Sequence, residues 1–204
     1  MGNVICWHNS EEALVGISCL ISSCATARRY KKTPDALFFM MAQGFFVLAA
    51  GSILHLLGHF LGEIQGLLFG SLIGYSIGFS SMLAAPFAEQ NKSLGRYLPV
   101  FSFVFISGLF LSSAFLVDFF RTRFSLWMPV AFLSSLLAFI YLSEYVKNKK
   151  KHTGAVTVGF FLVSISSVFL FFPADVRSFS WTAGHMLRPI GFSILMLGFT
   201  MRQE

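Results

Sequence analysis

The chain has 204 residues, of which 55% are hydrophobic and only 12% are Asp, Glu, Lys or Arg, and its formal net charge is +6. Soluble domains carry about 25% charged residues, so this composition excludes a soluble globular domain with a polar shell. The mean hydropathy of +0.72 indicates an integral membrane protein instead.

Seven stretches of the chain are long and apolar enough to cross a bilayer. A helix needs about 20 apolar residues to span the hydrocarbon core, which is roughly 30 Å thick. Together the stretches use most of the chain, so we predict an all-α fold, a seven-transmembrane-helix bundle that forms one integral membrane domain over residues 1–204. The predicted spans are 11–28, 36–61, 65–87, 98–118, 125–145, 154–172 and 180–200.

Basic residues are concentrated on alternate connections between these spans. Cytoplasmic connections carry an excess of Lys and Arg, so we predict a multi-pass protein of the cell membrane with its N-terminus outside and its C-terminus in the cytoplasm. The basic face also attracts anionic headgroups of the lipid bilayer, which explains the net charge without nucleic acid. The cytoplasmic basic residues are Arg28, Arg29, Lys31, Lys32, Lys92, Arg96, Lys147, Lys149, Lys150, Lys151 and Arg202, and those on the opposite side are Arg121, Arg123 and Arg177.

The predicted span 65–87 has a regular glycine pattern that begins just before it. Small residues at every fourth position form a bare stripe on one helical face, which lets a neighbouring helix approach closely. We therefore predict tight helix packing along the stripe, and a groove for a flat ligand or a lipid tail is the alternative. The stripe consists of Gly62, Gly66, Gly70, Gly74 and Gly78.

Three histidines fall inside predicted spans. His55 and His59 are four residues apart and share a helical face, and His185 lies at a similar depth in the last span. If their helices are neighbours, the three imidazoles can converge. Such a cluster suits Zn, Cu or Fe, and two histidines from different helices can hold haem. A metal ion or haem is therefore one hypothesis, and hydrogen bonds between helices are the other.

Arg188 follows His185 by three residues and lies on roughly the same helical face. Arginine keeps its charge inside a membrane, so it needs a carboxylate, carbonyl groups, water or an anionic ligand. One interpretation is an ion pair with an outer carboxylate, and the other is recognition of a ligand. The outer carboxylates available are Glu11, Glu12, Glu63 and Asp118. No catalytic motif is present, and the predicted ligand-binding residues are His55, His59, His185 and Arg188.

Both ends of the chain carry a loose pattern of motifs. The first part of the chain has an acidic outer start, then the basic loop 28–32 (Arg-Arg-Tyr-Lys-Lys) and the segment 49–55 (Ala-Ala-Gly-Ser-Ile-Leu-His). The last span contains Trp181 to His185, Arg188 and Gly191-Phe192. In these features the chain resembles the seven-transmembrane sensor domains of prokaryotic histidine kinases and diguanylate cyclases. The resemblance implies ligand sensing in the outer half and output through the last span. Since no kinase or cyclase domain follows within the sequence, it also implies a separate membrane or cytoplasmic partner protein.

The spans also divide into two triplets, 11–87 and 125–200, joined by span 98–118. This 3+1+3 pseudo-repeat resembles the topology of SWEET-class sugar transporters, although the Pro-Gln pair of their loops is absent. We therefore expect a non-enzymatic receptor, sensor or accessory membrane subunit that binds a small ligand or ion in the outer half of the bundle. A small-solute transporter and a metal- or haem-binding subunit are the alternatives.

Overall fold

The computed structural model describes residues 2–61, 65–90, 127–171 and 178–201, and within these ranges the chain is helical without strands. The all-α prediction is confirmed for this part of the chain. The predicted span 98–118 lies outside the described residues. The helices are α1 (Gly2–Lys32), α2 (Ala36–Phe60), α3 (Gln65–Gln90), α6 (Trp127–Asn148), α7 (Lys151–Phe171) and α8 (Phe179–Thr200).

Four of the described helices are long and apolar enough to cross a membrane. They are α2, the Gly66–Ala85 part of α3, α6 and α7. The other two helices, α1 and α8, carry the buried charged residues Glu11, Glu12 and Arg188. These lengths and compositions favour a membrane protein. The two helices that are not apolar enough by this measure, α1 and α8, are those that carry charged residues into the bundle.

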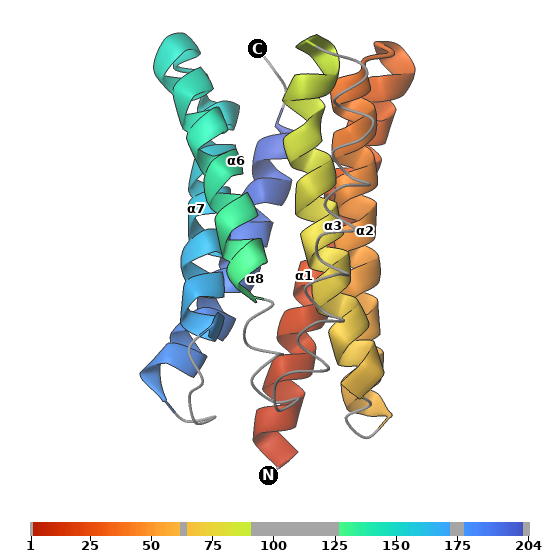
Figure 1. The fold of residues 1–204 in the computed structure, drawn as a ribbon, viewed down its shortest axis with the longest axis vertical. Coiled ribbons are helices and arrows are strands. Elements are labelled where there is room, and N and C mark those ends of the chain that lie inside the picture. The colour runs from red at the N-terminus through yellow and green to blue at the C-terminus, as the bar shows by residue number, and fades with distance from the viewer. Residues whose placement is uncertain (1, 62–64, 91–126, 172–177, 202–204) are drawn as a thin grey trace, which may run out of the picture.

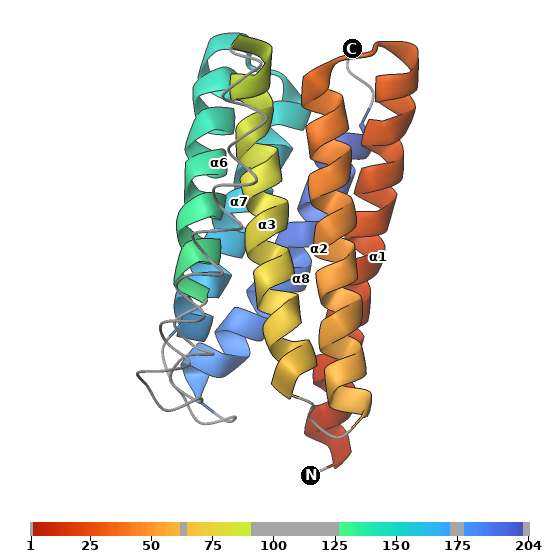
Figure 2. The ribbon, with the colours of Figure 1, turned by 45° about the vertical axis from the view of Figure 1, so that its right-hand side comes forward.

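The described helices form two three-helix units (Figure 1). In the N-terminal unit α2 packs against both α1 and α3, and in the C-terminal unit α7 packs against both α6 and α8. The units meet where α1 contacts α8 and where α3 contacts α6. The helices of each unit alternate in direction in the same order, and the beginning of α1 and the end of α8 lie at opposite ends of the bundle (Figure 2). Two triplets of helices that repeat the same order of directions are what the 3+1+3 pseudo-repeat predicts.

Glycines bring α2 and α3 together over part of the predicted stripe. A Cβ atom on Gly74 would lie 3.2 Å from Gly51 Cα, and one on Gly78 would lie 2.9 Å from the Gly44 carbonyl oxygen. The backbones of α2 and α3 thus approach closely at these two positions. Their backbones are so close that a larger side chain would force the helices apart.

Gly66 and Gly70, in the first turns of α3, make looser contacts with the described residues. No described atom lies within 4 Å of a Cβ built on Gly66, and one on Gly70 would make only an ordinary contact, 3.6 Å from Leu54 Cδ1. Close packing at Gly66 and Gly70 stays a prediction, because the described part of α2 makes no contact at these two positions as tight as those at Gly74 and Gly78. Gly62 lies outside the described residues.

A second glycine contact joins α7 and α8. A Cβ atom on Gly159 would lie 3.0 Å from the Gly191 carbonyl oxygen, and one on Gly191 would lie 3.0 Å from that of Gly159. This contact was not predicted from the sequence, although Gly184, Gly191 and Gly198 recur at every seventh residue and all three face α7. Each unit thus contains one glycine-mediated helix pair that keeps two backbones in register.

Aromatic side chains fill the space between the two units. The Phe79 ring of α3 lies 6.3 Å from that of Phe160 and 6.2 Å from that of Phe192, measured between centroids. All three are fully buried or nearly so. Phe79 and Phe192 each lie one helical turn beyond a polar residue, Tyr75 on α3 and Arg188 on α8. An apolar layer therefore closes one side of the polar site.

Candidate functional site

The site begins with two adjacent acidic residues that α1 carries into the bundle. The exposed fractions of Glu11 and Glu12 are 3% and 0%. An ionised carboxylate is costly to bury unless it is paired and hydrogen-bonded. The residues around Glu11 and Glu12 are therefore expected to supply positive charge and hydrogen-bond donors.

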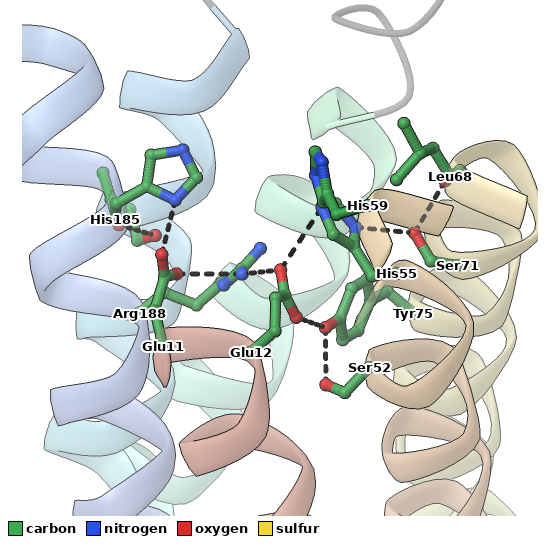
Figure 3. A network of polar contacts seen from close by, with 12 residues as sticks. Glu11, Glu12, Ser52, His55, His59, Leu68, Ser71, Tyr75, His185 and Arg188 are labelled. Carbon is green, nitrogen blue, oxygen red and sulfur yellow. Dashed lines mark hydrogen bonds and ion pairs between the residues drawn. The ribbon is translucent and has the colours of Figure 1, made fainter. Parts of the chain in front are cut away.

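Arg188 of α8 supplies the positive charge. Its side chain is 1% exposed, and its Nη2 atom lies 2.8 Å from Glu11 Oε1 and in direct contact with Glu12 Oε1. This is the ion pair that the sequence suggested for Arg188, with two of the four carboxylates considered. Glu63 and Asp118 lie outside the described residues. The pair joins α1 of one unit to α8 of the other (Figure 3).

His185 binds the other oxygen of Glu11. Its Nδ1 atom lies 2.6 Å from Glu11 Oε2, and the Trp181 ring lies 4.4 Å from the imidazole, measured between centroids. Because His185 and Arg188 are three residues apart on α8, they share a helical face and reach the same carboxylate. The three-residue spacing of His185 and Arg188 thus lets both side chains contact the same carboxylate, Glu11.

His55 and His59 lie on the α2 side of the network. His55 Nδ1 is 2.9 Å from the Ser71 hydroxyl of α3, and His55 Nε2 is 3.6 Å from Glu12 Oε1. His59 Nε2 lies 3.2 Å from His55 Nε2. For these two nitrogens to share a hydrogen bond, one must carry a proton and the other must accept it. The pair therefore links the protonation of one imidazole to that of the other.

Tyr75 of α3 completes the surroundings of Glu12. Its hydroxyl donates to Glu12 Oε2 at 2.8 Å and also lies 2.7 Å from the Ser52 hydroxyl of α2. Glu12 is consequently held by side chains from three other helices. Tyr75, Ser52 and Ser71 were missed as site residues in the sequence. The signals were that Ser52 belongs to the segment 49–55 and that Tyr75 directly follows Gly74.

Aromatic rings flank the guanidinium group of Arg188. Its Cζ atom lies 5.2 Å from the centroid of the Trp127 ring and 5.7 Å from that of the Tyr75 ring, within cation–π range. Its Nε and Nη1 atoms are buried and have no hydrogen-bond partner among the described residues. Arg188 thus retains hydrogen-bonding capacity beyond its two carboxylate contacts.

The structure brings the four predicted ligand-binding residues into one network without bringing the imidazoles to one point. Figure 3 shows His185 on one side and His55 with His59 on the other, separated by the carboxylates and Arg188. In the described ranges, no group of three His, Cys, Asp or Glu side chains is placed to hold a metal ion. A metal ion or haem bound by His55, His59 and His185 stays a prediction that the geometry does not favour.

Comparisons with known proteins identify no relative: no family model, no curated protein and no solved structure matches the chain. The function must therefore be argued from the chemistry of the site itself.

Proposed function

We propose that the chain is a seven-helix membrane protein that binds a small ion in the outer half of its bundle and acts as a receptor, a sensor or an accessory subunit. The charge balance of the network carries the proposal. Within the described part of the chain, Arg188 is the one fixed cation that contacts the buried Glu11 and Glu12. With neutral imidazoles the network has a net charge of −1, which a membrane interior strongly disfavours.

A proton is the simplest ion that restores neutrality. Each carboxylate has an imidazole nearby: His185 Nδ1 lies 2.6 Å from Glu11 Oε2, and His55 Nε2 lies 3.6 Å from Glu12 Oε1. A proton held at either position offsets the excess negative charge, and at the His185–Glu11 contact it also lies in a charge-assisted hydrogen bond. A monovalent cation among the carboxylate oxygens could take the place of this proton.

The position of the network favours a sensing role. Arg188 and His185 belong to the C-terminal unit, whereas Glu11, Glu12 and His55 belong to the N-terminal unit. Binding of an ion therefore changes the attraction between the two units. A ligand shifts a conformational equilibrium when its affinity differs between the two states, and an ion at this joint meets that condition. The last helix, α8, would transmit the change to a separate partner protein at the basic face.

Intrinsic fluorescence provides a direct test. The chain has three tryptophans, of which Trp127 contacts Arg188 and Trp181 contacts His185. A Trp7→Phe background leaves these two as reporters. Purified protein is titrated from about pH 5 to about pH 8, where an unperturbed imidazole changes its charge, in sodium chloride and in choline chloride of equal ionic strength.

We expect one fluorescence transition in the starting protein and its loss in Glu12→Gln. The transition should persist in Glu144→Gln, a matched substitution of an exposed glutamate near the end of α6. A midpoint that shifts with sodium and not with choline would identify a competing cation. Emission that does not change with pH or sodium would refute ion binding at the network.

Transport is a second candidate, and the arrangement of two similar three-helix units around a polar network favours it. Parallel repeats with a site at their interface are common among small transporters. Proteoliposomes with an internal pH-sensitive dye separate the two functions. A sensor binds protons without net flux, whereas a transporter acidifies the lumen at a rate that Glu12→Gln abolishes. The aromatic layer of Phe79, Phe160 and Phe192 beside the site favours binding without flux.

A further inference from the structure

A second site, lined by apolar residues such as Leu37, Phe38 and Val156 as well as by charged ones, lies at the opposite end of the bundle from the charged network. A cavity of about 210 Å³ opens there between the two units. This volume is more than ten times the roughly 10–15 Å³ that one water requires. The last turns of α1, α6 and α8 and the first turns of α2 and α7 surround it, and its polar wall is formed by Arg29, Tyr141, Glu144, Asn148, Lys150 and His152.

Positive charge predominates in this wall. Arg29 and Lys150 are fixed cations, His152 can become one, and Glu144 is the single carboxylate. Glu144 already accepts a hydrogen bond from the Asn148 side-chain amide. The exposed Lys150 lies at the opening of the cavity, whereas Arg29 and His152 are half-buried in its wall. The charged part of the cavity wall is therefore complementary to an anionic group.

Arg29 is held in position at one edge of the cavity. Its Nη2 atom donates to the carbonyl oxygen of Met201, the cap residue of α8, at 2.7 Å. Partial burial lowers the pKa of Arg29 below its ordinary value, as expected for a cation that has lost water without gaining a carboxylate. No described carboxylate forms an ion pair with it. Its remaining donors can thus serve a bound anion.

The turn between α6 and α7 brings the other cations to the cavity. Lys149 adopts a left-handed backbone conformation (φ 53°), and its N–H donates to the Tyr145 carbonyl oxygen at 2.7 Å. This conformation ends α6 and lets α7 begin only two residues later. Because the chain reverses so sharply, Lys150 and His152 lie beside Arg29 of α1 instead of projecting away from the bundle.

We infer that this cavity binds a phosphate group, either the headgroup of an anionic phospholipid or free phosphate. A phosphate accepts several hydrogen bonds and suits the planar fork of Arg29 together with the ammonium group of Lys150. Its location at the basic end of the bundle matches the level of anionic headgroups on the cytoplasmic side. This inference does not depend on the ion proposed for the charged network.

Thermal unfolding of the detergent-purified full chain tests the inference at constant ionic strength. The probes are inorganic phosphate, a short-chain phosphatidylglycerol, and a short-chain phosphatidylcholine as the zwitterionic control. A rise in Tm with phosphate and with phosphatidylglycerol shows that the cavity takes the group from either source. A rise with only one of them identifies that source. No rise with either probe overturns the inference.

Matched variants show whether the effect comes from the cavity. Arg29→Gln should weaken the binding that raises Tm by about tenfold or more, because charge-assisted hydrogen bonds are lost. Arg28→Gln removes an exposed charge that does not line the cavity, so the affinity for the probe should stay within about twofold of the starting protein. If Arg29→Gln does not fold, Lys150→Gln replaces it as the test variant, and Lys149→Gln is then the matched control. Equal loss in both members of a pair would assign the effect to general surface charge and overturn the inference.

Discussion

Glu12 of α1 and Arg188 of α8 are 176 residues apart in sequence and in direct ionic contact inside the bundle. Both are almost completely buried. The contact crosses the boundary between the two three-helix units, so it contributes both to the stability of the fold and to the electrostatics of the site.

Arg188→Leu should reduce the free energy of unfolding by about 3–5 kcal/mol, because it leaves two buried carboxylates without their cation. Urea or thermal unfolding of the purified protein in detergent measures this. Glu12→Gln combined with Arg188→Leu should cost less than the sum of the single changes, by about 0.5–3 kcal/mol. Strict additivity of the two substitutions would show that the contact is not energetically coupled.

Arg188→Lys should separate folding from function. Lysine keeps the positive charge that Glu11 and Glu12 need, but it cannot present a planar fork to several acceptors. We expect the variant to retain cooperative unfolding and to show an altered pH response of Trp127 fluorescence. A pH response identical to that of the unsubstituted protein would mean that Arg188 contributes only its charge.

The described helices and part of the site could be predicted from the sequence, but the neighbours of each helix could not. The three-residue spacing of His185 and Arg188 predicts a shared face, and the structure gives them a shared carboxylate, Glu11. The sequence does not reveal that α1 packs between α2 and α8. For that reason His55 and His185 looked able to converge, whereas the carboxylates of α1 and Arg188 lie between them.

The glycine stripe illustrates the same limit. Its period predicts a face of α3 that a neighbour can approach, but the crossing point of two helices depends on both partners. The partner glycines Gly44 and Gly51 of α2 lie opposite Gly78 and Gly74, and no described residue closes on Gly66. A pattern within one helix therefore could not show where on that helix the close contact begins and ends.

Gly74→Leu and Gly66→Leu form a matched pair that tests this packing. Leucine at Gly74 meets the Gly51 backbone, so we expect a loss of about 1–3 kcal/mol in the free energy of unfolding. At Gly66, where no described atom lies within 4 Å of an added Cβ, the same change should stay within about 0.5 kcal/mol. Equal losses in the two unfolding curves would be incompatible with the described crossing of α2 and α3.

Tyr75→Phe removes one hydroxyl and keeps the ring. Glu12 loses a donor and Ser52 loses its partner, so we expect a reduction of about 1–3 kcal/mol in the free energy of unfolding. The pH at which the tryptophan fluorescence changes should shift as well, because the network around Glu12 loses one hydrogen-bond donor. Tyr30→Phe, at an exposed position of α1, is the control and should change neither quantity.

The orientation of the bundle is tested most directly by labelling single cysteines in intact cells with a membrane-impermeant maleimide. After Cys6, Cys19 and Cys24 are replaced by serine, one cysteine is placed at Asn9, near the charged network, and another in a separate variant at Lys151, near the cavity. We predict that Asn9→Cys is labelled from outside and that Lys151→Cys is labelled only after the cells are opened. Labelling of both positions from the same side would contradict a membrane-crossing bundle with its ion site outside and its basic cavity inside.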